Sequence, residues 1–371
     1  MSREEITAIL ADQAREIVSR FKGCPVYIWG SGQHGKWLVE HIGEKILGFI
    51  DSNPLKQGAS ISSYQVIAPE DVCRYKENKV IISVTSDYES IASYLSSIGM
   101  KEGLNYVVAF PLAKLQYLFS KTDSYIQRVG KYDFTGKTLL EVGYGGQLYL
   151  ASLFAFLGAE KVYVSDIVEH SADVKKNAEP KLKQYIKYLV DSYPNRCDSD
   201  YTLQHLLDKI QNSIEIVSEP CVAEELPFDD SELDGIYSSG VMEHVNDPDK
   251  AFEEFGRVIK PGGLAMCLDI GVNDHRANDP TSGYNVWSYF EIPDTVWNTY
   301  TNNAYHQNRW LGVDFKRELA AKGFEIVHYD ADKDYSLSKE QIERFDSRFR
   351  VYDYDDLIDV YPWVIGRREN L

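Results

Sequence analysis

Two glycine-rich turns, each placed directly after a short apolar stretch, constrain the fold of this chain more than any other feature. The first turn, Gly30–Gly35 (GSGQHG), follows Pro25–Trp29, and the second, Gly143–Gly146 (GYGG), follows Thr138–Val142. Glycine lets the backbone turn tightly between a strand and a helix, so that the helix N-terminus can approach a bound ligand. Each turn therefore predicts the start of a β-α-β unit with parallel strands.

An acidic residue follows each turn at a similar distance. Asp51 lies 21 positions beyond Gly30, and Asp166 lies 23 positions beyond Gly143, each at the end of a second predicted strand. A carboxylate in this place can bind a ribose hydroxyl. The chain has 371 residues, which is enough for two such domains. We therefore predict an α/β protein with two Rossmann-like domains, the first of them built on a small parallel sheet.

The predicted helices and strands divide the chain into three parts. We expect a small accessory domain with an N-terminal helix over residues 1–110, a connecting helix over 111–132 and a larger domain over 133–371. The larger domain contains three stretches that exceed a plain crossover, and we interpret them as inserts at 168–213, 271–310 and 331–361. We expect the first insert to form a lid or an oligomer contact.

Charge and composition limit the partners of this chain. Acidic residues outnumber basic residues by 57 to 39, and the resulting net charge of −18 repels nucleic-acid phosphates and anionic membranes. No apolar run approaches the roughly 18 residues of a membrane span, and the charged N-terminal segment does not resemble a signal peptide. The five cysteines are dispersed, which is typical of reduced thiols. We expect a cytoplasmic protein with a small-molecule substrate, no nucleic-acid partner and no membrane span.

We expect no metal ion. Asp269, Asp274 and Asp279 lie close together in the sequence, and hard cations such as Mg²⁺ prefer oxygen ligands. Acidic residues at this density are nevertheless common in a chain that has 57 of them. No Cys/His cluster with the spacing of a structural zinc site is present in the sequence.

The second predicted domain resembles class I S-adenosylmethionine-dependent methyltransferases in four stretches that occur in the order of that family. They are LLEVGYGG, VYVSDI, AEELPFDDSELDGIYSSGVMEHV and DPDKAFEEFGRVIKPGGLAMCLDI. The resemblance implies S-adenosylmethionine as cofactor and a seven-stranded sheet with Phe324–Tyr329 and Pro362–Arg367 as its antiparallel last strands. It also implies a set of cofactor-binding residues: Glu141, Gly143, Gly145 and Gly146 around the methionine part, and Asp166 on the ribose.

Two positions depart from the pattern of that family. Gln147 stands where the family has a third glycine, and Cys221-Val222 stand where it has an acid that contacts adenine. We therefore expect backbone amides, together with Ala223 or Glu224, to hold the adenine.

Methyl transfer to a hydroxyl needs a base, because hydroxyls are poor nucleophiles. His244 follows the predicted fourth strand and Asp274-His275 follow the fifth, at the edge of the sheet where ligands bind. The pairs Asp274-His275 and Asn308-Arg309 resemble surface-polysaccharide sugar methyltransferases. That resemblance implies that His275 is the base and Asp274 its partner or a hydroxyl ligand, with His244 as the alternative base. It also implies that Asn308 and Arg309 bind substrate, with Arg309 on an anionic group such as a nucleotide phosphate.

The first predicted domain resembles, over residues 24–110, the nucleotide-sugar-binding domain of sugar acyltransferases and the accessory domain of some sugar methyltransferases. The matching stretches are VYIWGSGQHGKWLVEHI and ILGFIDSNPLKQG. The resemblance implies that Gly30, Gly32 and Asp51 bind a nucleotide-linked sugar. The alternative is a scaffold whose glycines only pack a strand against a helix.

The leading prediction is an S-adenosylmethionine-dependent O-methyltransferase that acts on a sugar or nucleotide-sugar in polysaccharide or glycoconjugate biosynthesis, as a monomer or a homo-oligomer. Carbon or nitrogen acceptors remain open, because the fold serves all of them. A second alternative is an NAD(P)-dependent oxidoreductase that uses the first turn and a Tyr-x-x-x-Lys pair such as Tyr117/Lys121. A third is a binding module without enzymatic activity.

Overall fold

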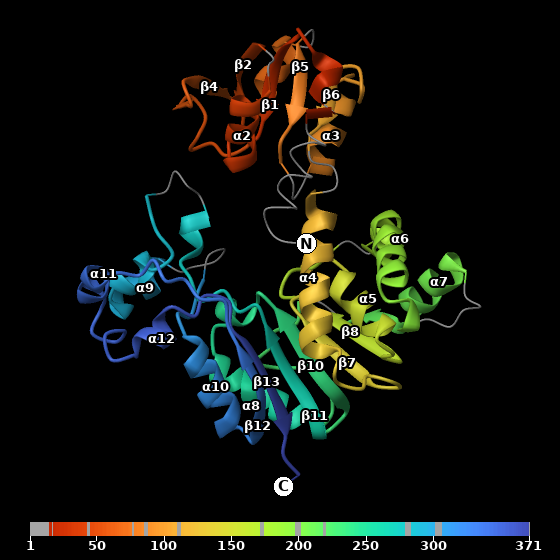
Figure 1. Ribbon diagram of the computed structural model, residues 1–371, viewed down its shortest axis with the longest axis vertical. Coiled ribbons are helices and arrows are strands. Elements are labelled where there is room, and N and C mark those ends of the chain that lie inside the picture. Colours follow the sequence, from red (N-terminus) through yellow and green to blue (C-terminus); the bar gives the residue numbers. More distant parts are fainter. Residues whose placement is uncertain are drawn as a thin grey trace. The chain divides into compact units, whose positions relative to one another are not determined.

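The chain divides into two compact units, Met1–Gln127 and Arg128–Leu371, which are drawn in Figure 1. A computed structural model describes residues 15–16, 18–42, 45–75, 78–84, 88–109, 113–170, 174–196, 202–217, 220–278, 283–300 and 306–370. Most of the expected N-terminal helix, and Asp279, lie outside these residues. The boundary between the units falls inside helix α4 (Ala113–Val129). Within the described residues no helix is long and apolar enough to cross a bilayer.

The first unit is built on a six-stranded sheet whose order is β3-β4-β2-β1-β5-β6. Its strands are β1 (Pro25–Trp29), β2 (Lys45–Ile50), β3 (Ser60–Ile61), β4 (Tyr64–Ile67), β5 (Lys79–Ile82) and β6 (Tyr106–Val108). Its helices are η1 (Ser19–Phe21), α2 (Gln33–His41), η2 (Pro69–Tyr75) and α3 (Tyr88–Ser97). All strand pairs are parallel except β3–β4. This confirms the predicted small parallel sheet, to which the structure adds one antiparallel pair at the β3 edge.

The second unit is built on a seven-stranded sheet whose order is β12-β13-β11-β10-β7-β8-β9. Its strands are β7 (Thr138–Val142), β8 (Lys161–Ser165), β9 (Ile214–Ile216), β10 (Leu233–Ser239), β11 (Ile259–Leu268), β12 (Phe324–Asp330) and β13 (Trp363–Arg368). Because β13 pairs antiparallel with both β11 and β12, it is the one strand that runs against the other six. The last two strands are therefore antiparallel to each other, while β12 keeps the direction of the parallel strands.

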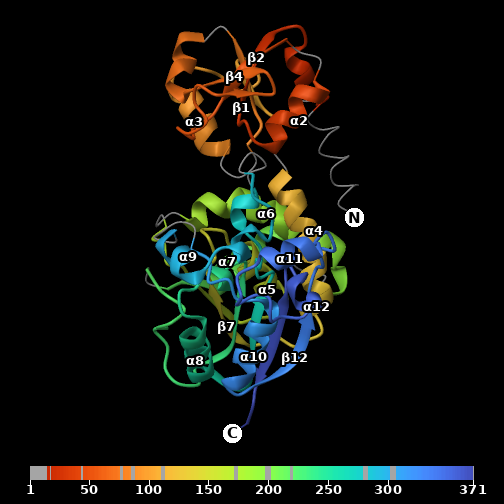
Figure 2. The same cartoon turned by 90° about the vertical axis from the view of Figure 1, so that its left-hand side faces the viewer.

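Helices cover the second sheet in layers that Figures 1 and 2 show from two sides. The helices are α5 (Tyr149–Phe156), α6 (Val174–Ser192), η3 (Pro194–Arg196), α7 (Leu203–Ser213), η4 (Met242–His244), α8 (Pro248–Val258), η5 (His275–Asn278), η6 (Ser288–Glu291), α9 (Asp294–Tyr300), α10 (Gly312–Ala321), α11 (Lys339–Arg344) and α12 (Tyr354–Leu357). Helices α5, α6 and α7 pack together beside β8 and β9, whereas α8 and α10 pack together beside β11–β13.

Helix α8 illustrates how the sequence positions one of these layers. Asp247 caps the helix by accepting a hydrogen bond from the backbone N of Lys250 at 3.2 Å, and Pro248 occupies the first turn, where a missing N–H costs nothing. Phe252 and Phe255, three positions apart, are both buried in the core beneath the sheet. Burial of this apolar stripe is the main force that holds the helix on the sheet.

The segments predicted as the second and third inserts pack together on a separate apolar core. Its members come from residues 287–297, 311 and 337–358 and include Trp287, Phe290, Trp297 and Phe349. The side chain of Arg309 is fully enclosed beside Trp297 and Phe349, with its guanidinium carbon 5.1 and 5.2 Å from the two ring centres. We call this region, residues 283–300 and 331–361, the cap.

The position of the ligand crevice follows from the strand order. The chain moves outward from β7 through β8 to β9, and it then returns to the other side of β7 as β10. At such a switch point the loops after two neighbouring parallel strands diverge and leave a crevice at their carboxyl ends. We therefore expect the ligand-binding site at the loops that follow β7 and β10.

Arg309 is expected to stabilise the cap. Its NH1 donates to the carbonyls of Tyr289 (2.7 Å) and Ile292 (2.5 Å), and its NH2 donates to Asp294. Arg309→Met keeps the apolar stem but removes the charged donor to the Tyr289 and Ile292 carbonyls, so we expect the free energy of unfolding in urea to fall by about 2 kcal/mol. Asp294 keeps its ion pair with Arg348. Arg344→Met removes an exposed ion pair with Glu291 and should cost less than about 1 kcal/mol. An unchanged urea midpoint for Arg309→Met would contradict this role.

Candidate functional site

The turn after β7 forms the floor of the crevice. Gly143, Gly145 and Gly146 have φ values of +76°, +59° and +68°, a region that side chains rarely adopt. At Gly143 the constraint is also steric, because a Cβ there would lie 2.5 Å from a methyl group of Val241 in the loop after β10. The turn is thus packed against the loop that carries His244, and Gly145 within the turn is exposed.

Asp166 lies at the end of β8 and is tied to this turn. Its carboxylate accepts hydrogen bonds from the backbone N of Gly145 (2.8 Å) and of Val168 (3.0 Å). His170 lies beside both Asp166 and the turn. Its Nε2 is 3.3 Å from Asp166 Oδ2, and its ring would be 2.9 Å from a Cβ placed on Gly146. The predicted ribose acid therefore stands beside the glycine turn, with a histidine that the sequence analysis did not single out.

Glu141 is buried inside β7, directly below the turn. The hydroxyl of Tyr237 on β10 donates to its Oε2 at 3.1 Å. Burial raises the pKa of Glu141 to about 8, and the nearby Asp166 raises it further, against the hydrogen bonds that lower it. The carboxyl group is consequently protonated at neutral pH until a positive charge comes near it.

The residues predicted to hold adenine lie on the other side of Asp166. The backbone N of Cys221 donates to the carbonyl of Asp166 at 2.8 Å, which holds this segment beside the ribose acid. Ala223 is buried. Glu224 accepts a hydrogen bond from the backbone N of Asp247 at 3.1 Å and so supports the start of α8.

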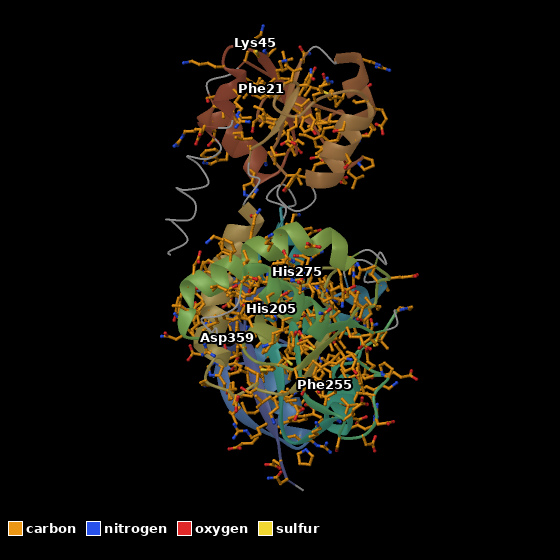
Figure 3. All side chains as sticks on the ribbon, turned by 90° about the vertical axis from the view of Figure 1, so that its right-hand side faces the viewer. Phe21, Lys45, His205, Phe255, His275 and Asp359 are labelled. Carbon is orange, nitrogen blue, oxygen red and sulfur yellow. The ribbon has the colours of Figure 1, made fainter. Side chains whose placement is uncertain are left out.

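Three titratable side chains meet at the carboxyl ends of β10 and β11. Glu243 and His244 belong to η4 and His275 to η5; His275 is labelled in Figure 3. The two imidazole rings are 4.9 Å apart, and Nε2 of His275 is 3.9 Å from Oε1 of Glu243. One donor atom from each of the three lies within 4.8 Å of the others, so the group could hold a metal ion. We call these residues the acidic-histidine cluster.

Burial sets the protonation of the acidic-histidine cluster. It lowers the pKa of His275 to about 4, with a further lowering by His244, so His275 is neutral at neutral pH and one of its ring nitrogens carries a free electron pair. Burial raises the pKa of Glu243, which is 4% exposed. In both groups burial acts against the charged form.

Residues 306–308 hold the two loops of the cluster together. The carbonyl of His306 lies 2.6 Å from Nδ1 of His244. Oε1 of Gln307 accepts from the backbone N of His275 at 3.0 Å. Nδ2 of Asn308 donates to the carbonyls of Met242 (2.7 Å) and Val245 (3.0 Å). Asn308, predicted to bind substrate, thus acts on the backbone that carries Glu243 and His244.

Asp274 and Arg309 are each engaged inside the protein. Asp274 is 0% exposed, and its carboxylate accepts hydrogen bonds from Nε (2.9 Å) and NH2 (2.6 Å) of Arg276. This pairing turns the carboxylate of Asp274 to Arg276, where the sequence suggested His275 or a substrate hydroxyl. The guanidinium of Arg309 is enclosed in the cap and leaves no surface for a substrate phosphate, so we assign it a structural role.

The glycine turn of the first unit has its own acid in place. The carboxylate of Asp51 accepts hydrogen bonds from the backbone N of Ser31 (3.1 Å), from the hydroxyl of Ser31 and from the backbone N of Asn53 (3.0 Å). Burial acts to raise the pKa of Asp51, but these hydrogen bonds and Lys56 outweigh it, and the pKa is lowered. Gly30 has φ +104°, and Gly32 is the residue before α2, with open space around a Cβ.

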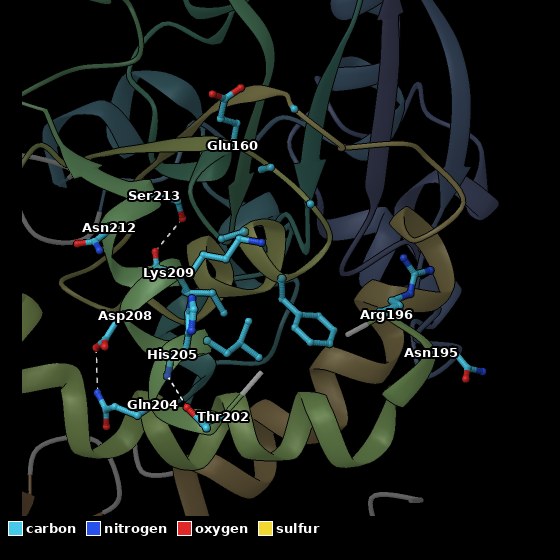
Figure 4. Close-up of a pocket in the computed structure, with 17 residues that line it drawn as sticks. Glu160, Asn195, Arg196, Thr202, Gln204, His205, Asp208, Lys209, Asn212 and Ser213 are labelled. Carbon is cyan, nitrogen blue, oxygen red and sulfur yellow. Dashed lines mark hydrogen bonds between the residues drawn. The ribbon is translucent and has the colours of Figure 1, made fainter. Parts of the chain in front are cut away.

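A cavity of the second unit lies away from this crevice. It has a volume of about 1230 Å³, and Gly136 is among the residues that line it. Figure 4 labels others, such as Glu160, His205 and Lys209. Gly136 and Glu160 precede β7 and β8, so this cavity opens at the amino ends of the strands. A cavity of about 430 Å³, lined by Lys137, Asp234 and Lys260 among others, opens at the same edge. Neither contains the residues that the fold places at the ligand crevice.

Sequence reasoning missed Glu243, Gln307 and His170. Glu243 stands next to His244 in the stretch MEHV, so its identity was visible but its direction was not. Gln307 directly precedes the predicted Asn308-Arg309 pair, and only the fold brings it to His275. His170 lies four positions beyond Asp166, and that short spacing was the one available signal.

The raised pKa of Glu141 predicts a pH-dependent stability. Between its ordinary value of 4.5 and about 8, the unfolded chain ionises this carboxyl while the folded chain keeps it protonated. Unfolding then releases a proton, so this group lowers the free energy of unfolding by up to about 1.4 kcal/mol per pH unit as the pH rises through that window. Glu141→Gln should lack this slope and gain stability relative to the wild type from pH 5 to 8 in urea unfolding. Parallel curves for both proteins would refute the assignment.

Comparisons with known proteins agree on the nature of the second unit. A family model described as a methyltransferase domain matches residues 115–329, more than half of the chain. A model described as C2185-like, N-terminal, matches residues 24–103. The chain is 32% identical over 117 residues to 2-methoxy-6-polyprenyl-1,4-benzoquinol methylase of Mus musculus, covering 29% of this chain and 35% of that protein. It is 39% identical over 71 residues to a ubiquinone/menaquinone biosynthesis C-methyltransferase of Brucella anthropi, covering 19% and 26%.

The chain spans about a third of the length of the first of these relatives. Among solved structures it is similar to an S-adenosylmethionine-dependent methyltransferase of Mesorhizobium loti, with 16% identity and a TM-score of 0.38, over 67% of this chain and 98% of that chain. A glycine turn, an acid at the end of the next strand and a crevice at a switch point of the sheet together suit a ligand with a ribose. Because the family model spans this whole site, the chain belongs to the methyltransferase-domain family.

Proposed function

We propose that this methyltransferase acts on a hydroxyl group of a small acceptor, and that the acceptor is a sugar or nucleotide-sugar. The observation that carries the hydroxyl acceptor is the acidic-histidine cluster at the carboxyl ends of β10 and β11. A hydroxyl must lose its proton as it attacks, and imidazole and carboxylate groups are the side chains that usually assist this. Among the described residues, Glu243, His244 and His275 meet in this place, with donor atoms within 4.8 Å of one another.

The cofactor side of the proposal assigns roles to the residues around the turn. When bound, S-adenosylmethionine supplies a methyl group that is activated by a positively charged sulfur. Gly143, Gly145 and Gly146 expose backbone to its methionine part, and Glu141 faces the ammonium from below. Asp166 would exchange its hydrogen bond with Gly145 N for the ribose hydroxyls. Cys221 and Ala223 flank the adenine, with Glu224 at their end.

The sugar part of the proposal rests on the resemblance of two sequence pieces and on the first unit. The pairs Asp274-His275 and Asn308-Arg309 resemble sugar methyltransferases of surface-polysaccharide biosynthesis. A glycine turn with Asp51 at its side is compatible with a nucleotide-linked sugar, because such a turn brings backbone N–H groups close to a phosphate. In this proposal the enzyme works in the cytoplasm on a soluble precursor of a polysaccharide or glycoconjugate.

A second candidate is methyl transfer to a ring carbon of a quinol. It is favoured by the similarity to the quinol methylase of Mus musculus and the C-methyltransferase of Brucella anthropi. Those similarities cover 29% and 19% of this chain, and the fold serves carbon, nitrogen and oxygen acceptors alike. A parallel screen of nucleotide-sugars and of short-chain quinols with tritiated cofactor would separate the two candidates.

Calorimetric titration tests the cofactor assignment. We expect S-adenosylmethionine and S-adenosylhomocysteine to bind the wild type, and Asp166→Ala to bind them roughly 10 to 100 times more weakly, because a charged hydrogen-bond acceptor is worth about 1.5–3 kcal/mol. Asp191→Ala, which removes an exposed acid on α6, is the matched control and should bind normally. Binding of NAD alone, or equal affinities of all three proteins, would contradict the assignment.

Substitution of His275 tests the acceptor side. We expect His275→Ala to lose about 10²- to 10⁴-fold in turnover, the usual contribution of a group that assists proton transfer. Its affinity for S-adenosylhomocysteine should stay within a factor of about 3, because the ring lies outside the glycine turn. His205→Ala, a substitution on exposed α7, serves as the control for loss of a histidine. Full turnover of His275→Ala would remove His275 from the proposal.

A further inference from the structure

The acidic-histidine cluster has the composition and spacing of a metal-binding site. One carboxylate and two imidazoles converge from two loops that are far apart in the sequence, and one donor atom of each lies within 4.8 Å of the others. Nε2 of His275 and Oε1 of Glu243 are 3.9 Å apart. Two ligands of one metal ion, each about 2.1 Å from it, are separated by a similar or slightly smaller distance.

The side chain of Glu243 provides a second, independent observation in favour of a metal-binding site. The side chain is 4% exposed, yet its Oε2 has no hydrogen-bond partner among the described residues. A buried acceptor without a partner is costly and calls for an explanation, such as an ion that the site binds. The site itself is polar, with both imidazoles beside this carboxyl group.

His244 is oriented as metal-binding histidines usually are. Its Nδ1 lies 2.6 Å from the carbonyl of His306, and a carbonyl can only accept, so Nδ1 carries the proton and Nε2 keeps a free electron pair. A backbone carbonyl on the outer ring nitrogen is the common way in which proteins fix the tautomer and direction of a metal ligand. Asn308 and Gln307 form hydrogen bonds with the backbones of the two loops and so hold the loops in place.

Gly271 leaves room for the cluster. A Cβ at this position would lie 2.6 Å from Oε1 of Glu243 and 2.6 Å from Nε2 of His275. Both donor atoms therefore point at the same small space beside the backbone after β11, which any side chain at this position would fill.

We propose that Glu243, His244 and His275 bind one divalent transition-metal ion, which holds and activates the acceptor hydroxyl. Two imidazoles and one carboxylate suit ions of the series from Mn²⁺ to Zn²⁺, whereas Mg²⁺ and Ca²⁺ take oxygen ligands. Three protein ligands leave open positions for a substrate, as in catalytic zinc sites. The placement of the acceptor rests on the proposed O-methyltransferase function, and in this form His275 acts as a metal ligand in place of a free base. The sequence alone predicted no such site, because its members come from two separate stretches, η4 and η5.

The chemistry of the step balances with water as the proton acceptor. An acceptor hydroxyl that binds the metal ion becomes more acidic, and its proton passes to a water molecule. The hydroxyl oxygen then attacks the methyl carbon, the new O–CH₃ bond forms as the S–CH₃ bond breaks, and the electron pair of the broken bond stays on the now neutral sulfur. Open positions side by side favour an acceptor with two neighbouring oxygens, such as a vicinal diol.

Cobalt is the probe for the test, because Co²⁺ replaces metals of this series and absorbs visible light when bound to protein. The tag-free full chain, dialysed against EDTA and then against metal-free buffer, is titrated with Co²⁺ by equilibrium dialysis and absorption. We expect about one Co²⁺ per chain, and loss of that binding in Glu243→Gln, His244→Ala and His275→Ala. His205→Ala should bind like the wild type, and S-adenosylhomocysteine affinity verifies that each variant is folded. Absence of binding, or binding that survives all three substitutions, overturns the site.

Two further measurements separate this site from the proposed function. Asn308→Ala, which removes an outer contact while keeping all three ligands, should weaken Co²⁺ binding about 10- to 100-fold. Turnover should fall on treatment with EDTA and return with added metal, while S-adenosylhomocysteine affinity is unchanged. Turnover that EDTA leaves intact overturns the activating role. If no hydroxyl acceptor is methylated at all, the proposed function fails, and Co²⁺ binding still decides whether the cluster is a metal site.

Discussion

The amide side chains of Gln307 and Asn308 hold together two loops that would otherwise diverge. Parallel strands β10 and β11 end side by side, but the chain leaves them in different directions, through η4 and through residues 269–275. Asn308 donates to two carbonyls of the first loop, and Gln307 accepts the backbone N of His275 in the second. Because these hydrogen bonds are made to the backbone, they hold both loops independently of the rotamers of the loops' own side chains. The distances between Glu243, His244 and His275, and with them any chemistry at the cluster, depend on these hydrogen bonds.

The two sides of the crevice are built in different ways. On the cofactor side, the glycine turn and Asp166 lie within 23 residues of each other, and the hydrogen bond from Gly145 to Asp166 closes a single β-α-β unit. On the side proposed for the acceptor, η4, η5 and the segment at 306–308 are joined by hydrogen bonds. A local unit has a recurrent spacing that can be read from one sequence. An assembly of three distant segments has no such spacing, which is why Glu243 and Gln307 escaped the sequence analysis.

Charged residues show the limit of reading chemistry from residue type. Asp274 and Arg309 have the right groups for a substrate site and lie next to residues that reach it. In the fold, the carboxylate of Asp274 faces Arg276, and Arg309 lies within the apolar core of the cap, bonded to Asp294 and two carbonyls. A buried charge is stable only when it is paired and hydrogen-bonded within the protein, so the charges of Asp274 and Arg309 have structural partners. Their neighbours His275 and Asn308 are the ones that bear on the cluster.

The sequence by itself determined the two glycine turns, the acids that follow them, the parallel strands and the family of the second unit. These features are determined locally, because backbone conformation at glycine and the alternation of apolar strands and amphipathic helices depend on neighbours along the chain. Only the tertiary structure decided which polar groups meet, that His244 and His275 share one cluster with Glu243, and that Arg309 is enclosed. Those contacts depend on the strand order and on the directions of loops that are distant in the sequence. Burial then shifts the pKa values of the carboxyls and imidazoles that meet there.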